Sequence, residues 1–264
     1  MSYEYFTLEK NGHVAVVSFN RPDKMNALSA DVLEELEHVA HSFRSDGETR
    51  AVVFRGEGRH FSSGADLTDP KAAERAALPL VVRRRNLRLG QRVLRALLEM
   101  DQITIAAMHG GALGGGACIA TAVDFRVGSE SCWVCYPEIN LGINLQWIGL
   151  PLCVHLVGPS RAKRLVILGE RETAQTLLQW GFLDEVVPDG QELDRALEMA
   201  RAYAAQPPVP AQMIKRSVNK IVGALDEAVM HMDFDQWQLA ALTEDAATAR
   251  EHFREEEKPE FKGS

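Results

Sequence analysis

Two glycine-containing segments and one acid have the residue types and spacing of a site that stabilises negative charge on a substrate oxygen. FSSGADL covers residues 61–67, HGGALGGGACIATAVD covers residues 109–124, and Glu138 follows in YPEINLG. Each segment follows a predicted strand, and the second opens a predicted helix, so that free N–H groups and the helix dipole both favour negative charge. Two N–H donors that converge on one oxygen form an oxyanion hole.

The glycine-rich segment differs from the known phosphate-binding loops. No G-K-[ST] follows it, and its spacing is not G-x-G-x-x-G, so neither a Walker A loop nor a dinucleotide fingerprint is predicted. Gly64 allows a tight turn in the first segment, and Asp66 is expected to cap the next helix. Either segment alone is typical of a tight turn, but the two together with Glu138 indicate a site.

The elements that position these residues have an alternating pattern. HVAVVSF (13–19) and RAVVFRG (50–56) are β-branched runs that predict strands, and the apolar spacing between them predicts a helix capped by Ser29. Strand, helix and strand in this order predict parallel pairing with a right-handed crossover.

Further elements are expected along the rest of the chain. An Arg/Leu-rich helix is predicted to end near Met100, strands are predicted at 104–110, 124–129 and CWVCY, and a helical region after Pro137. From about residue 159 the pattern is helical, with one short edge strand at 184–187.

Composition limits the class of protein. The chain has 264 residues, 46% of them hydrophobic and 25% charged, with a formal net charge of −8. This acidity argues against a nucleic-acid partner. Residues 102–123 and 139–160 lack Lys, Arg, Asp and Glu, but their polar residues, glycines and proline favour buried core over membrane spans. MSYEYFTLEKNGHV lacks the features of a secretory signal, so we expect a cytoplasmic protein.

Four cysteines in so long a chain do not predict a disulfide framework. Cys132 and Cys135 form a C-x-x-C without a second pair for zinc, in a segment that reads as a strand. We interpret them as buried structural thiols rather than a redox or metal site, and no metal site is predicted.

The four segments FNRPDKMNALS, HFSSGADL, HGGALGGGAC and YPEINLGI, in this order and spacing, resemble the enoyl-CoA hydratase/isomerase (crotonase) superfamily. The similarity continues through GPSRAKRLVILGE and GFLDEVV to the end, so it covers nearly the whole chain. It implies an α/β fold, a crotonase-like spiral of ββα units with a helical C-terminal trimerisation portion. It further implies a core with the CoA site over residues 1–200, a helical portion over 201–264 with a soft boundary, and a homotrimer or dimer of trimers.

The resemblance also assigns roles to residues. The backbone N–H groups of Ala65 and Gly115 correspond to the family's oxyanion hole, which binds a thioester oxygen, and Glu138 corresponds to its later catalytic glutamate. No cofactor is implied, because coenzyme A is part of the acyl-CoA substrate. The positions expected to contact the substrate or its CoA are Lys24, Met25, Ala27, Ser63, Gly64, Asp66, Leu67, Gly111, Gly114, Pro137 and Trp147.

Three further groups of residues have two interpretations each. Lys24 is expected either to meet a CoA phosphate or to be solvated. His60 and His109 flank the two segments, either lining the site or packing beside it. Phe253, Lys258, Phe261 and Lys262 resemble the family's tail, which can reach the CoA bound by a neighbouring subunit, although the acidic run at 255–257 departs from a basic pattern.

Cys118 decides between the family's reactions. Hydratases of the family use two glutamates to hold and activate water, and the earlier one lies just after the glycine triplet, where this chain has Cys118. A thiol accepts hydrogen bonds poorly and is a poor partner for this work. One glutamate is sufficient for a Δ3,Δ2-enoyl-CoA isomerase, in which Glu138 moves a proton from C2 to C4. Its apolar neighbourhood is expected to raise the pKa of Glu138.

Two alternatives remain open. One is an enoyl-CoA hydratase in which other groups hold the water, for which Cys118→Glu should raise hydration. The other is a catalytically weak acyl-CoA-binding member of the family, which would bind thioesters tightly and respond little to Glu138→Gln.

Overall fold

Runs of β-branched and small apolar residues form the larger of two sheets. The computed structural model describes residues 3–253 and 259–264, with Glu227 described by its backbone alone. Within these residues the larger sheet has the strand order β1-β2-β3-β4-β6-β9, and only the β1–β2 pair is antiparallel. Its strands are β1 (Phe6–Asn11), β2 (Val14–Phe19), β3 (Ala51–Gly56), β4 (Ile103–Met108), β6 (Phe125–Ser129) and β9 (Glu185–Val187).

The opening unit agrees with the sequence prediction. β2 and β3 pair in parallel, and α1 (Ala30–Ser42) connects them. The Ser29 side chain accepts a hydrogen bond from the Val32 N–H, which confirms the predicted cap. The predicted edge strand is also present, because β9 pairs with β6 at one end of the sheet. β1, at the other end, was not predicted.

A second sheet of three short strands explains the ββα repeat. Its strands are β5 (Gly111–Leu113), β7 (Trp133–Cys135) and β8 (Glu172–Thr173), in the order β5-β7-β8. β4 of the large sheet is followed by β5 of the small sheet and then by α5 (Gly115–Ala122), and β6 is followed in the same way by β7. β5 and β7 pair in parallel, so the segments that follow them, with Gly115 and Glu138, start from the same edge of the small sheet.

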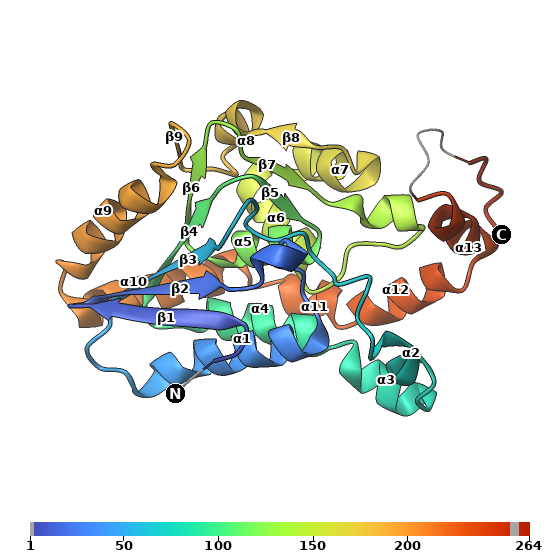
Figure 1. Cartoon of the computed structure of the whole chain (residues 1–264), viewed down its shortest axis with the longest axis horizontal. Helices are drawn as coiled ribbons and strands as arrows, with labels where there is room; N and C mark the ends of the chain where they lie inside the picture. Colours follow the sequence, from blue (N-terminus) through green and yellow to red (C-terminus); the bar gives the residue numbers. More distant parts are fainter. Residues whose placement is uncertain (1–2, 254–258) are drawn as a thin grey trace.

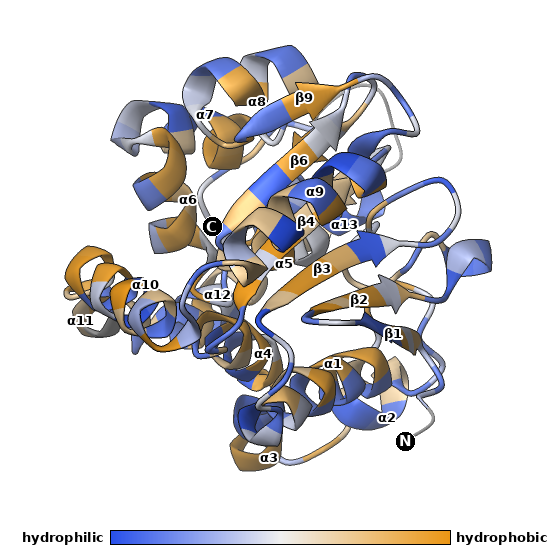
Figure 2. Ribbon diagram, turned by 90° about the vertical axis from the view of Figure 1, so that its left-hand side faces the viewer, coloured by the Kyte–Doolittle hydropathy of each residue, from blue (hydrophilic) through white to orange (hydrophobic). Residues whose placement is uncertain are grey.

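Both faces of the large sheet are covered. Along β3, Val52 and Phe54 pack into the core shared with α1 and α5, whereas Ala51 and Val53 face α9 (Glu192–Ala204). This alternation is the period of two expected of a strand. Figure 1 shows α9 on one side of the sheet and α1 and α4 on the other, and Figure 2 shows the same layers from the side.

Helices make up most of the remaining chain. The segment before β4 contains α2 (Ala72–Ala76), α3 (Leu80–Asn86) and α4 (Leu89–Leu98), and the short 3-10 helices are η1 (Pro22–Lys24), η2 (Phe43–Ser45) and η3 (Pro137–Leu141). After η3 follow α6 (Gly149–Val157), α7 (Pro159–Leu168), α8 (Ala174–Trp180), α10 (Pro208–Val222), α11 (Asp226–Met230), α12 (Asp233–Ala241) and α13 (Glu244–Glu251).

The helical C-terminal portion is tied to the sheet by a buried cation. The ammonium of Lys215, on α10, donates to the Gln102 carbonyl oxygen and to Asp124, each at 2.7 Å. Residue 200, near which a soft boundary was predicted, lies within α9, and α9 packs on the sheet. The division into two portions at this point therefore stays a prediction.

The cysteine prediction is confirmed in the part of the chain that the structure describes. Cys118, Cys132, Cys135 and Cys153 are all free and buried. No helix among the described residues is long and apolar enough to cross a membrane.

Candidate active site

The segment that precedes α1 holds the first predicted loop in place. Leu28 N–H donates to the Gly64 carbonyl and Asp66 N–H donates to the Leu28 carbonyl. In a parallel bridge of this kind the N–H of the intervening residue, Ala65, points away from its partner strand. Among the described residues the Ala65 N–H makes no backbone hydrogen bond, and Ala65 lines the cavity described below. It is therefore available as a donor.

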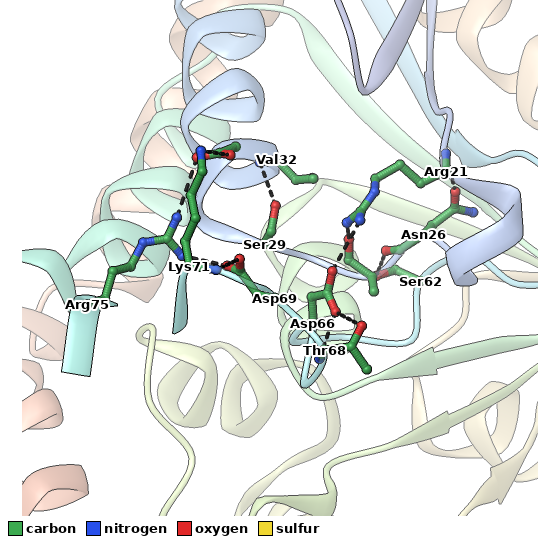
Figure 3. Close-up of polar contacts among 12 residues, drawn as sticks. Arg21, Asn26, Ser29, Val32, Ser62, Asp66, Thr68, Asp69, Lys71 and Arg75 are labelled. Atoms are coloured by element: carbon green, nitrogen blue, oxygen red, sulfur yellow. Dashed lines mark hydrogen bonds and ion pairs between the residues drawn. The ribbon is translucent and has the colours of Figure 1, made fainter. Parts of the chain in front are cut away.

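Side chains of the same two segments lock this geometry. The guanidinium of Arg21 contacts the carboxylate of Asp66 at 3.1 Å, and the hydroxyl of Ser62 donates to the carbonyl of Asn26 at 2.8 Å. Figure 3 shows these four residues converging from the two segments. Asp66 also accepts from the N–H and hydroxyl of Thr68. The prediction that Asp66 caps a helix is wrong, because its oxygens are used in this turn and by Arg21, and α2 begins only at Ala72.

Asn26 is a structural residue that the sequence interpretation did not single out. It is 1% exposed and, like Met25, has a left-handed backbone, with φ of 54°. Its side-chain amide donates to the carbonyls of Glu57 and His60, both at 2.9 Å. Asparagine is among the few residues that adopt this backbone conformation readily, which is the signal that could have identified it.

The glycine-rich loop runs directly beside the first loop. Ser62 bridges to Ala112, and Leu113 N–H donates to the Ser62 carbonyl at 3.0 Å. A Cβ atom on Gly64 would lie 2.5 Å from the Leu113 carbonyl oxygen and 3.4 Å from the Gly115 nitrogen. The absence of a Cβ atom on Gly64 lets the two backbones approach each other, and Ala65 and Gly115 both line the cavity described below.

Gly115 is the first residue of α5, so its N–H has no partner within the helix. Gly114, which precedes it, has a left-handed φ of 46°, and its own N–H donates to the Cys135 carbonyl at 2.9 Å. The Gly115 amide therefore combines an exposed donor with the positive end of a helix dipole. This is the geometry that an oxyanion requires of its second donor.

His60 and His109 pack beside these loops. Nδ1 of His60 accepts the Gly111 N–H at 2.9 Å, and Nε2 of His109 lies 3.1 Å from the Gly58 carbonyl oxygen. Neither histidine is among the residues that line the cavity described below. Of the two interpretations, the packed and hydrogen-bonded one is confirmed.

Glu138 lies on η3, whose first residue is Pro137. A Cβ atom on Gly114 would lie 2.7 Å from Oε1 of Glu138, so this carboxylate rests against the glycine-rich backbone. Its other oxygen, Oε2, is buried and has no hydrogen-bond partner among the described residues. Burial raises the pKa of Glu138 to about 7, as the sequence predicted, so that near neutral pH it can both accept and return a proton.

Cys118 stands one turn further along α5, at the position where the sequence suggested that a second acid is missing. It is 1% exposed and lines the same cavity as Glu138. Burial, and then the charge of Glu138, raise the pKa of its thiol well above the usual range. The side chain is therefore a neutral thiol at physiological pH and cannot serve as a second general base.

A cavity of about 620 Å³ lies in front of these groups. Most of its walls are apolar, with acid and amide groups at a few points. It is lined by Ala65, Leu67, Gly115, Cys118, Glu138, Leu141, Ile143, Leu145, Gln146, Trp147, Trp237, Arg250, Glu251 and Phe253. The volume is in the range of small-molecule sites, which usually combine apolar walls with a few placed polar groups.

The structure brings most of the predicted site residues together. Ala65, Gly115, Glu138, Leu67 and Trp147 line the cavity. The expected residues that belong to the same loops but do not line the cavity are Ser63, Gly64, Asp66, Gly111, Gly114 and Pro137.

Three expected contact residues lie outside the cavity wall. Lys24 and Met25 are exposed on and after η1, whereas Ala27 is buried and its carbonyl accepts from the Arg21 guanidinium at 2.6 Å. Their contact with the CoA portion of a substrate stays a prediction.

The wall built from the C-terminal helices was missed by sequence reasoning. Trp237 comes from α12, Arg250 and Glu251 come from α13, and Phe253 follows it. Phe253, expected in a tail that reaches a neighbour, lines the cavity of its own chain. Lys258 and the acidic run 255–257 lie outside the described residues, and Phe261 and Lys262 are exposed. Within the described residues, no three His, Cys, Asp or Glu side chains are grouped as a metal site requires.

Comparison with known proteins identifies relatives of this chain and of its fold. Residues 9–264 match the family model described as enoyl-CoA hydratase/isomerase. A short-chain-enoyl-CoA hydratase of Clostridium acetobutylicum is 32% identical over 254 residues, covering 96% of this chain and 95% of that protein. The fold matches an enoyl-CoA hydratase structure from Mycobacterium avium subsp. paratuberculosis K-10 with a TM-score of 0.86 at 23% identity, covering 99% and 100% of the two chains. A monofunctional enoyl-CoA isomerase from M. smegmatis matches with a TM-score of 0.70 at 27% identity, over 83% of this chain and 93% of that one.

Proposed function

The chain belongs to the enoyl-CoA hydratase/isomerase family, and we propose that it is a Δ3,Δ2-enoyl-CoA isomerase with Glu138 as its only acid/base. One observation carries this proposal. The Glu138 carboxylate, with a pKa raised to about 7 by burial and one oxygen without a partner among the described residues, shares the cavity with a neutral thiol where a second acid would stand. Glu251, the other carboxylate in the cavity wall, is exposed on α13. The pair of Glu138 and Cys118 suits a proton transfer within the substrate better than the activation of water.

The reaction needs one group that moves a proton and one that holds charge. Glu138 accepts a proton from C2 of the Δ3-enoyl thioester, and the electrons of that C–H bond form a dienolate on the thioester oxygen. The amides of Ala65 and Gly115 donate to this oxygen. Glu138 then returns the same proton to C4, which gives the Δ2-enoyl thioester without consuming water, and CoA takes part only as a portion of the substrate.

The backbone donors carry much of the expected rate enhancement. Removing one oxyanion donor typically costs about 3–4 kcal/mol in the transition state. A side-chain substitution cannot delete a backbone N–H, so the stabilisation is protected against most mutations of Ala65. Its geometry depends instead on the close approach of the two glycine-containing loops.

Hydration is the second candidate, and two observations favour it. The relative from Clostridium acetobutylicum is named a hydratase. In this chain Gln146 lines the cavity, and its Oε1 is a buried acceptor without a partner among the described residues. A water molecule between Gln146 and Glu138 would satisfy both orphaned oxygens, in place of the second glutamate of the family's hydratases.

Turnover of two isomeric substrates separates these candidates. Purified wild type, Glu138→Gln and Gln146→Leu are each given a trans-Δ3- and a trans-Δ2-enoyl-CoA, and the ultraviolet absorbance of the Δ2 thioester is followed. The isomerase predicts that absorbance appears from the Δ3 substrate, that this is lost in Glu138→Gln, and that hydration of the Δ2 substrate is negligible. Fast hydration that falls in Gln146→Leu would establish the second candidate instead. Binding of both thioesters without turnover would indicate an acyl-CoA-binding protein.

We further propose that copies of this chain associate through the C-terminal helices, as a homotrimer or a dimer of trimers. Support comes from the large apolar side chains that α10, α11 and α12 expose, which also appear as orange bands on α10 and α11 in Figure 2. These residues are Val209, Met213, Ile214, Val218, Ile221, Val222, Val229 and Leu239. An exposed apolar patch of this kind is typical of an interface. Light scattering coupled to size-exclusion chromatography measures the mass, and a monomer would contradict the proposal.

A further inference from the structure

The indole of Trp147 occupies a slot that two glycines leave open. A Cβ atom on Gly115 would lie 2.5 Å from Cζ3 of the indole, and one on Gly90, in α4, would overlap its five-membered ring. Because Gly115 supplies an oxyanion donor and Gly90 lies in a core helix, the ring lies between the catalytic backbone and the hydrophobic core. It forms a wall of the cavity at this point.

The backbone that carries this ring has an unfavourable conformation. Trp147 and Ile148 both have a left-handed backbone, with φ of 67° and 56°. Neither is glycine, asparagine or aspartate, and Ile148 is β-branched, so this pair is a genuine outlier. Such strain persists only where surrounding contacts over-determine it, and it is concentrated at functional sites.

The contact that holds this pair comes from a distant part of the chain. Asp233, at the start of α12, is 4% exposed and accepts the Ile148 N–H at 3.0 Å. Burial raises the pKa of the Asp233 carboxyl to about 6, although the backbone N–H groups of Ile148 and Trp147 lower it. Asp233 is not among the cavity-lining residues, so it acts on the site only through the residues it holds.

We propose that Asp233 is a positioning residue that fixes Trp147 in its slot, and that the fixed indole limits the length of the acyl chain the cavity accepts. The inference rests on the proposed acyl-CoA function, since it concerns the acyl end of the same ligand. Release of Trp147 from Asp233 would open the slot between α4 and α5 to the acyl chain. The enzyme would then favour longer thioesters.

The test measures binding, because binding does not depend on whether the reaction is isomerisation or hydration. Dissociation constants for butanoyl-CoA and decanoyl-CoA, which are saturated and unreactive, are measured by calorimetry on the full-length protein. The variants are Asp233→Ala, Trp147→Leu and their combination. Asp233→Asn keeps an acceptor oxygen, and Asp235→Ala is the matched control, because Asp235 lies on the same helix but pairs with Arg84 at the surface.

The proposal predicts that Asp233→Ala and Trp147→Leu each shift the ratio of the two dissociation constants toward decanoyl-CoA by about tenfold. The double variant should show no further shift, because Asp233 acts through Trp147. Asp233→Asn and Asp235→Ala should keep the wild-type ratio within about threefold.

Several results would overturn it. If Trp147→Leu leaves the ratio of the two dissociation constants unchanged, the proposal is wrong, even where Asp233→Ala fails to fold. Fully additive shifts of this ratio in the double variant would also contradict it. If wild type binds both thioesters and Asp233→Ala leaves the ratio unchanged, this inference alone is wrong. If wild type binds neither, the proposed function is wrong as well.

Discussion

Glu138, a partly buried acid in the cavity wall, and Asp233, a fully buried acid near it, both have a raised pKa, of about 7 and about 6, because their carboxyl groups are withdrawn from water. Their hydrogen-bond partners differ. Asp233 accepts a backbone N–H, whereas Oε2 of Glu138 has no partner in the described part of the chain. A raised pKa therefore does not by itself identify an acid/base residue. The carboxylate that keeps an oxygen without a hydrogen-bond partner among the described residues, and that lines the cavity, is the one available for chemistry.

The largest expected effect tests this contrast directly. Glu138→Gln should lower kcat by about a thousandfold or more, because a general acid/base typically contributes 10²–10⁴-fold. Asp233→Asn should lower it by about threefold at most, since the amide oxygen still accepts the Ile148 N–H. Steady-state kinetics on the Δ3 substrate measure both. Equal losses of kcat in the two variants would contradict the distinction between an acid/base role for Glu138 and a positioning role for Asp233.

The variant Gly114→Ala tests whether the glycine-rich backbone positions the carboxylate of Glu138. A new Cβ atom 2.7 Å from Oε1 must displace the carboxylate, and φ of 46° adds strain to alanine. We expect a loss of about a hundredfold in kcat, which is typical of small displacements of a catalytic group. Gly47→Ala is the control, because no atom lies within 4 Å of its Cβ position. Wild-type kcat in Gly114→Ala would show that Glu138 has freedom to move.

The pH dependence of kcat/KM should reflect Glu138. Only the ionised carboxylate accepts the C2 proton, so activity should fall about tenfold for each pH unit below 7 and level off above it. Asp233→Asn should leave this midpoint in place. A midpoint near 4.5 in wild type would mean that Glu138 is solvated during turnover.

The same burial has a cost in stability. Glu138 binds its proton more tightly in the folded state, with a pKa of about 7 against the ordinary value of 4.5 for a glutamate. The free energy of unfolding therefore falls as pH rises from 4.5 to 7 and stays low above that. Glu138→Gln should be more stable than wild type by about 3 kcal/mol at pH 8, and the gain should vanish near pH 4. Urea unfolding at both pH values measures it.

An exposed acid provides the reference for that stability measurement. Glu34, on the outer face of α1, is exposed, and Glu34→Gln should change the free energy of unfolding by about 0.5 kcal/mol or less at either pH. A gain of similar size in both variants would trace the effect to net charge instead of burial.

The sequence predicted the part of the site that depends on local backbone conformation and on short motifs. Gly64, Gly114 and Gly115 are needed because the loops touch, and glycine spacing reveals such contacts before a structure is known. Glu138 was identified from the P-E motif, and its raised pKa from the apolar segments on either side of it. The parallel pairing of β2 and β3 followed from their β-branched runs and the helix between them.

The missed features depend on contacts between distant segments. Trp237 and Asp233 are four residues apart on α12, a spacing that suggests a shared helix face but not what that face meets. The left-handed backbone of Trp147 has no signature in its own residue type. β1, β5 and β8 are short or pair at an edge, and tertiary context decides such strands more than propensity does.

The burial of the thiols has a practical consequence for reactivity. Burial raises the pKa of Cys132 and Cys153 to about 12 and of Cys135 to about 11, and it raises the pKa of Cys118 well above its usual range. Alkylating reagents and oxidants attack the thiolate, so the native enzyme should resist both. Labelling by iodoacetamide would then proceed only through transient opening of the chain. Because Cys118 lines the same cavity as Glu138, the rate at which it is labelled would report how often this part of the chain opens.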